Sequence, residues 1–395
     1  MLKRFFQREK KEQNLTPRLY LGVFGKHPGW DDHIEDIGID TDCLINVKRM
    51  LYFQGIEGNI QAGSWKELDE NQRLDGYRHL FVWLRGNDVV IGRMWSSSDG
   101  KGRTEYPMVV CGQCCNLRLA WITDVMLPRL EKIERQCKAT TSAADVQRII
   151  ADAYMELKSL IPRQPSESSK FLPDFGVLTR LANRPEMGPD HTGLHRILYH
   201  IEREMAAYRI AGTDTSANAS FSPPPVHLRV PVCADTRARA VLLWTNTLFT
   251  RIDPNTNVLL LLPQDETWVD IVVGEPSTME FYCLRASLEA IPLTSSIPYD
   301  LNSDFVERAE TLIDNSRSGK SEPSQPLIDP TAVAQKSAAN IKQDSISGNP
   351  RQTKEKKSRL GKFLLLLLVL VIIAAVLFGL SFYDVHDWIS LLVRG

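Results

Sequence analysis

The feature that most constrains this 395-residue chain is an uncharged run from Phe363 to Phe382, FLLLLLVLVIIAAVLFGLSF. A helix of this length, at about 1.5 Å per residue, extends about 30 Å, the thickness of the hydrocarbon core of a bilayer. The alternative is a helix buried in a soluble protein, but such helices are seldom apolar on every side over this length. The run therefore predicts a single transmembrane helix at residues 363–383.

Charges on either side of this run predict its orientation. Residues 351–362 hold six Lys or Arg against one Glu, whereas the tail at 384–395 holds one Arg against two Asp. Basic flanks stay in the cytoplasm. The chain begins MLKRFFQREKKEQ, which is basic but lacks the apolar centre of a signal peptide. We therefore expect a single-pass membrane protein with its main body in the cytoplasm and a short extracytoplasmic tail.

The composition of the body, with 43% hydrophobic and 24% charged residues over the whole chain, suits about two globular domains. The net charge of −1 hides a segregation, because residues 1–13 and 351–362 together hold +8 and the remainder is therefore near −9. That sign argues against a nucleic-acid binder with a broad basic face. Seven scattered Cys, an odd number, predict a reducing compartment rather than a disulfide framework.

Pro- and Ser-rich breaks predict the domain boundaries. We expect a basic N-terminal segment at 1–16, a first domain at 17–162, a second at 170–313 and a disordered basic linker at 314–362.

Apolar periodicity predicts the elements of both domains. The first domain is expected to have strands at 19–24, 79–85, 89–94 and 106–111 and a helix at 141–161, and is therefore an α/β (α+β) layered domain with a central sheet and flanking helices. The second is expected to have helices at 194–208 and 303–313 and strands at 226–232, 240–245, 258–262, 268–273 and 281–286. These predict a second, smaller sheet-containing α+β domain.

Two polar segments directly follow predicted strands, GVFGKHPGWDDHIED at 22–36 and SSSDGKGRTEYP at 96–107. Glycines mixed with ionisable residues at a sheet edge are typical of functional loops. The second segment could wrap backbone N–H groups around a phosphate, but it lacks both the GxxxxGK[ST] spacing and the G-x-S-x-G nucleophile elbow. It is therefore predicted to be a recognition loop without catalytic residues.

A metal site is the alternative for the first segment. Asp31, Asp32 and His33 could bind a divalent metal and serve a hydrolase or phosphatase. A solvated turn with an Asp that caps a helix explains the same residues. Adjacent side chains point in different directions, so a metal would need further ligands from elsewhere in the chain. We therefore expect neither a metal nor a cofactor here.

Two other patterns resemble metal motifs but are incomplete. The C-x-x-C at 111–114, followed by Cys115, has no second pair at finger spacing. His191 and His195 could share a helix face, but Thr192 occupies the glutamate position of HExxH. Zinc-finger and metalloprotease functions are therefore not expected, and the two histidines are predicted to be partly exposed at the start of a helix.

The two polar segments resemble the signatures of the TagF family, accessory proteins of bacterial type VI secretion. FGKHPGWDDHIED is similar to the G-K-x-P-x-x-x-D signature, and GRMWSSSDGKGRTEYPMVV is similar to a Ser-x-Asp-x-x-Gly-Arg run leading into a Tyr/Phe-Pro strand. The matching residues are Gly25, Lys26, Pro28, Asp32, Ser98, Gly102, Arg103, Tyr106 and Pro107, with Asp99 nearby.

The chain also departs from that family. Trp30, Asp31, Asp32 and His33 stand where the family continues with Gly-Asp-Phe, and a membrane anchor is added. The resemblance implies a divergent member in the bacterial inner membrane, without known catalysis, that restrains assembly of the secretion machine by binding a forkhead-associated scaffold protein.

On this basis the chain is predicted to be a membrane-tethered, non-catalytic adaptor or regulator. Arg103 has two possible roles: it points outward and forks onto a partner's carboxylate or phosphate, which we slightly favour, or it pairs internally with Asp32 or Asp99. The predicted partner-binding residues are Lys26, Pro28, Trp30, Asp31, Asp32, Ser98, Asp99, Lys101 and Arg103.

Overall fold

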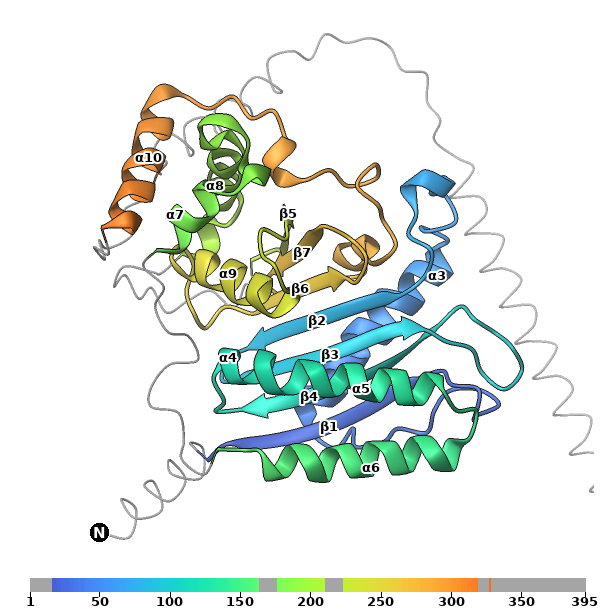
Figure 1. Ribbon diagram of the computed structural model, residues 1–395. Coiled ribbons are helices and arrows are strands. Elements are labelled where there is room, and N and C mark those ends of the chain that lie inside the picture. Colours follow the sequence, from blue (N-terminus) through green and yellow to red (C-terminus); the bar gives the residue numbers. More distant parts are fainter. Residues whose placement is uncertain (1–15, 163–175, 210–222, 319–326, 328–395) are drawn as a thin grey trace, which may run out of the picture. The chain divides into compact units, whose positions relative to one another are not determined.

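The computed structural model describes residues 16–162, 176–209, 223–318 and 327. The predicted transmembrane run at 363–382 and most of the predicted linker at 314–362 lie outside these residues. Among the helices of the described part, none has the length and apolar character needed to cross a bilayer. Figure 1 shows a central sheet with helices packed around it.

The sheet has seven strands in the order β1-β4-β3-β2-β6-β7-β5, and neighbouring strands are antiparallel. The strands are β1 Arg18–Gly25, β2 Arg78–Arg85, β3 Asp88–Ser96, β4 Pro107–Cys115, β5 Val226–Pro231, β6 Val258–Pro263 and β7 Trp268–Val273. All four strands expected in the first half are therefore confirmed, together with three of the five expected in the second half.

One sheet spans both halves of the chain. Strand β2 pairs with β3 on one side and with β6 on the other, so that His79 lies opposite Pro263 and Leu84 opposite Val258. The expectation of a second sheet at 170–313 is therefore wrong. The physical reason is that a buried strand needs partners for its N–H and C=O groups along both edges. β2 obtains the second set from a strand more than 170 residues away.

Helices connect and cover the strands. They are α2 Asp42–Lys48, α3 Gly58–Ala62, α4 Leu119–Trp121, α5 Leu127–Lys138, α6 Ala143–Ser159, α7 Val177–Ala182, α8 Thr192–Glu204, α9 Arg237–Phe249 and α10 Ser303–Arg317. A π-helical stretch, Arg49–Glu57, joins α2 to α3. The helices expected at 141–161, 194–208 and 303–313 are confirmed as α6, α8 and α10.

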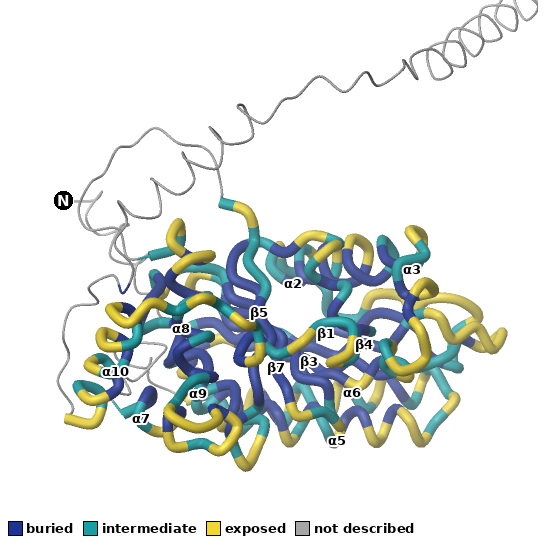
Figure 2. The backbone as a smooth tube through the Cα atoms, turned by 90° about the horizontal axis from the view of Figure 1, so that it is seen from above, coloured by how far each residue is buried: buried dark blue, intermediate teal, exposed yellow. Residues whose placement is uncertain are grey.

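Both faces of the sheet are buried, which gives the protein two hydrophobic cores. Along β2, Leu80, Val82 and Leu84 face the core covered by α5, α6, α8 and α9, whereas Phe81 and Trp83 face the core under α2 and the π-helical stretch. Figure 2 shows the strands dark blue in the middle of the molecule. Successive side chains of a strand alternate between these two buried faces, and both faces are apolar. The strands are therefore nearly continuous hydrophobic runs.

Two predicted strands are wrong. Residues 240–245 lie within α9, where the Thr236 side chain accepts a hydrogen bond from the Arg239 N–H and caps the helix. Residues 281–286 overlap the 3-10 helix Glu280–Leu284. A short apolar run does not distinguish a buried strand from a buried helix, and in α9 the cap was the sequence signal that favoured the helix.

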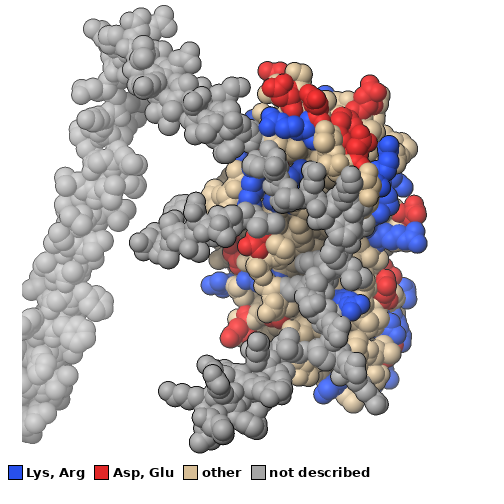
Figure 3. Space-filling view, turned by 90° about the vertical axis from the view of Figure 1, so that its left-hand side faces the viewer, with Lys and Arg blue, Asp and Glu red and all other residues tan. Residues whose placement is uncertain are grey.

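The charges on the described surface are mixed. In Figure 3 basic and acidic side chains alternate over the described part of the face, and several acidic side chains gather at its upper end. All seven cysteines are free thiols in the structure.

Candidate functional site

The two motif loops lie side by side. The first loop leaves the end of β1 and the second joins β3 to β4, and these ends are adjacent because Gly25 lies opposite Met108 (Figure 1). The Gly100 N–H donates to the Trp30 carbonyl at 2.7 Å, and the Lys26 N–H donates to the Pro107 carbonyl at 3.1 Å. The fold thus joins two motifs that are 73 residues apart in the sequence.

The carboxylate of Asp99 is the hub of this contact, and its side chain is completely buried. Oδ2 accepts hydrogen bonds from Lys26 Nζ and Arg103 Nε, both at 2.7 Å. Oδ1 accepts from the backbone N–H groups of Lys101 and Arg103, both at 3.0 Å. Burial alone would raise the pKa of Asp99, but the hydrogen bonds from Lys26 and Arg103 outweigh it and hold this pKa well below its usual range. Asp99 is therefore an ionised structural anchor.

Arg103 closes the two loops over this hub. Its Nη2 lies 3.1 Å from Asp32 Oδ1 and donates to the Asp31 carbonyl at 3.1 Å, while half of its side chain is exposed. The internal pairing is therefore present with both Asp32 and Asp99, and contact of the exposed half of Arg103 with a partner stays a prediction. Burial raises the pKa of Asp32, but the Arg103 guanidinium and His33 lower it more.

His27 fixes the first loop to the helical layer. Gly29 donates its N–H to His27 Nδ1 at 3.0 Å, so Nε2 carries the ring proton and donates it to the Cys137 carbonyl at 3.0 Å. A Cβ atom at Gly29 would lie 2.5 Å from the nitrogen of Ala143, so this close approach requires glycine. Sequence reasoning missed this role of His27, for which the only signal was its place inside the motif.

An aromatic cluster lies behind the loops. The ring of Tyr106 contacts the rings of His33 and Tyr52, with centroids 5.3 Å and 5.5 Å away, and Lys26 Nζ lies 5.5 Å from the Tyr106 centroid. Tyr52 comes from the π-helical stretch and is 1% exposed. Nothing in the local sequence of Tyr52 indicated this contact, which depends on tertiary packing alone.

The predicted partner-binding residues divide into three sets by burial. Lys26 and Asp99 are 3% and 2% exposed, so their assignment to direct partner contact is wrong, because a buried ion pair holds the loops together instead. Pro28, Trp30 and Ser98 are partly buried. Asp31, Asp32, Lys101 and Arg103 are exposed, and we call these four residues the motif surface.

The charges at the motif surface disfavour a metal bound by Asp31, Asp32 and His33. Asp32 Oδ1 lies 2.9 Å from His33 Nδ1, 3.1 Å from Arg103 Nη2 and 3.8 Å from Lys26 Nζ. Two permanent cations next to a carboxylate oppose the approach of a metal cation. Asp99 is also disfavoured as the general base of a hydrolase, because its two carboxylate oxygens already accept four hydrogen bonds.

Comparison with known proteins adds no relative: no protein family model matches the chain, and no curated protein sequence matches it significantly.

Proposed function

We propose that this protein is a membrane-tethered, non-catalytic adaptor that regulates the assembly of a type VI secretion apparatus by binding another protein. The observation that supports the proposal best is the union of the two TagF-like motifs through the Asp99 hub. Both motifs contribute exposed charges to one surface, with Asp31 and Asp32 from the first loop and Lys101 and Arg103 from the second.

The rigidity of this surface favours binding. Lys26, Asp99 and His27 are buried and hydrogen bonded, so both loops are held in place before a partner arrives. A preorganised surface loses less conformational entropy on association. No described residue pairs with the Asp31 carboxylate or the Lys101 ammonium, which therefore remain available to opposite charges on a partner.

The proposed partner is a forkhead-associated scaffold protein or another component of the secretion apparatus, by resemblance to the TagF family. In this proposal the motif surface does not contact nucleic acid, binds no cofactor and contains no catalytic residue. The alternative of a hydrolase that uses Asp31, Asp32 and His33 is disfavoured by the two cations beside Asp32.

The proposed anchor is the run at 363–382, as a single span in the bacterial inner membrane with the body in the cytoplasm. Tethering would raise the effective concentration of the motif surface near a membrane-embedded machine without any new contact. A reporter active only outside the cytoplasm should be silent when fused before Met1 and active when fused after Gly395. The reverse pattern would overturn this topology.

Crosslinking from membranes tests the binding proposal. The full-length chain would be co-produced with a candidate forkhead-associated scaffold, and the captured complex quantified. The double variant Asp31→Ala and Lys101→Ala should reduce capture roughly tenfold, the loss expected for about 1.4 kcal/mol of binding energy.

A matched control removes the same charges elsewhere. Asp152→Ala and Arg135→Ala change exposed residues of α6 and α5, and this double variant should leave capture unchanged. Equal capture by both double variants would overturn the assignment of the motif surface.

A further inference from the structure

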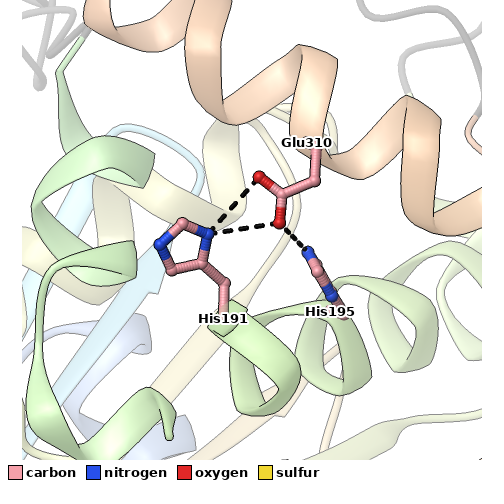
Figure 4. A group of neighbouring side chains, drawn as sticks. All are labelled: His191, His195 and Glu310. Atoms are coloured by element: carbon pink, nitrogen blue, oxygen red, sulfur yellow. Dashed lines mark hydrogen bonds and ion pairs between the residues drawn. The ribbon is translucent and has the colours of Figure 1, made fainter. Parts of the chain in front are cut away.

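A second cluster of polar side chains lies apart from the motif surface, at the start of α8. His191 immediately precedes this helix, His195 is one turn further along it, and Glu310 projects toward both from α10 (Figure 4). His191 Nδ1 lies 3.2 Å from Glu310 Oε1, and His195 Nε2 lies 2.8 Å from the same oxygen. We call these three residues the histidine cluster.

The spacing of the three ligand atoms suits a metal ion. One nitrogen of each imidazole and one oxygen of the carboxylate all lie within 4.8 Å of one another. Tetrahedral zinc with bonds of about 2.0–2.1 Å separates its ligands by about 3.3 Å. The two observed separations are close to this value, so a small outward movement of His195 or Glu310 would admit the ion.

His195 supplies an independent indication of a ligand. The residue is 4% exposed, so the prediction that His195 is partly exposed is wrong. Its buried Nε2 lies 2.8 Å from Glu310 Oε1 but forms no hydrogen bond of acceptable geometry with any described residue. A buried polar atom without a hydrogen bond is costly unless something else satisfies it. A metal placed between Nε2 and the carboxylate would use the nitrogen lone pair.

The charges around Glu310 leave room for a cation. In the part of the chain that the structure describes, its carboxylate forms ion-pair contacts with the two histidines and with no Lys or Arg.

The other group of potential ligands, His227, Asp270 and Cys283, differs in this respect. Asp270 already accepts hydrogen bonds from Arg229 Nε at 2.7 Å and Nη2 at 2.9 Å, as well as from Trp268 Nε1 at 3.1 Å. A guanidinium thus occupies the place that an ion would need.

We propose that His191, His195 and Glu310 bind one divalent transition-metal ion, with zinc the best match to two imidazoles and one carboxylate. His191 and Glu310 are about one-third exposed, which leaves the fourth position to water. The ion would join α8 to α10, the last helix of the described body, in addition to the apolar contacts of Phe305, Ala309 and Ile313. It would stabilise the body without taking part in the motif surface.

Zinc titration of the full-length chain in detergent tests this site. The protein would be stripped with a chelator, freed of it, and titrated with zinc alone by calorimetry. We expect one equivalent to bind, and Co²⁺ in place of zinc should give visible absorption bands typical of four-coordinate cobalt. Binding of no zinc would overturn the proposal.

Substitutions locate the ion. His195→Asn and Glu310→Gln should each weaken zinc binding by at least roughly tenfold, since loss of even a hydrogen-bond partner of a ligand commonly costs this much. Glu310→Gln changes a partly exposed side chain, and it decides the question if His195→Asn does not fold.

Two control variants complete the test. Glu307→Gln removes an exposed carboxylate from the same helix, and His33→Asn removes the exposed histidine of the first motif loop. Both should bind zinc like the unaltered chain. Loss of binding in His33→Asn, or unchanged binding in Glu310→Gln, would contradict the proposed ligands.

Discussion

The Asp99 hub and the histidine cluster share one arrangement, a carboxylate between two basic side chains, but the basic side chains differ in charge. Each centres on one carboxylate contacted by two basic side chains: Lys26 and Arg103 at Asp99, and His191 and His195 at Glu310. Lysine and arginine carry permanent charges, so the negative charge of the ionised Asp99 is balanced and its carboxylate is fully hydrogen bonded. Imidazoles are mostly neutral at pH 7 and keep a lone pair. The basicity of the partners thus decides whether such a cluster is a scaffold or a candidate ligand site.

The largest effect expected from this comparison is at the hub. Lys26→Met should lower the melting temperature of the full-length chain by roughly 10 °C, because it leaves the buried Asp99 carboxylate without its closest buried cation. Lys101→Met removes the same charge from an exposed position and should change the melting temperature by less than about 2 °C. Equal melting temperatures for the two variants would refute a structural role for Lys26.

Zinc should produce the next largest effect, through the histidine cluster. At a zinc concentration of about 100 times Kd, binding to the native state adds about 2.7 kcal/mol, which corresponds to a rise of about 5 °C in the melting temperature. The same rise should appear in Lys26→Met, because the two clusters share no residue. A rise that persists in Glu310→Gln would show that zinc acts elsewhere.

A smaller effect is expected at Arg103, whose side chain is half exposed. Arg103→Ala should lower the melting temperature by a few degrees, less than Lys26→Met, because solvent replaces part of the lost pairing. Arg103→Lys should recover only part of the loss, since an ammonium cannot contact Asp99 and Asp32 with the geometry of a guanidinium. Thermal unfolding of the three proteins side by side measures this order, and full recovery in Arg103→Lys would contradict it.

The smallest expected effect is the loss of folding stability at acidic pH. The pKa of Asp99 and that of Asp32 are lower in the folded state than the ordinary value of about 3.9. Their contribution to stability is therefore complete above the unfolded pKa and is lost progressively as pH falls below about 4. The stability difference between the unaltered chain and Asp99→Asn, measured by denaturant unfolding without metal, should be constant at pH 5–7 and shrink toward pH 3. A difference that grows in this range would mean that the sign is wrong.

The seven strands and the helices α6, α8 and α10 could be predicted from the sequence, because alternation and helical periodicity are local properties of the chain. The strands at 19–24 and 89–94 and the helix at 141–161 show this. Residues 240–245 could not be assigned by the same reasoning, since their apolar run is too short to have a clear period. The cap at Thr236, which lies outside the run, favoured the helix.

The candidate loops could be found in the sequence alone, because their glycines, their charges and their positions after strands are local features of the chain. The contact between the two loops depends on the fold, because Lys26 meets Asp99 through the pairing of β1 with β4. The same holds for the histidine cluster. The i, i+4 spacing indicated that His191 and His195 could lie close together, although His191 precedes α8 in a left-handed conformation, and Glu310 is 119 residues from His191. Its approach depends on the packing of α10 beside α8, which no local pattern encodes.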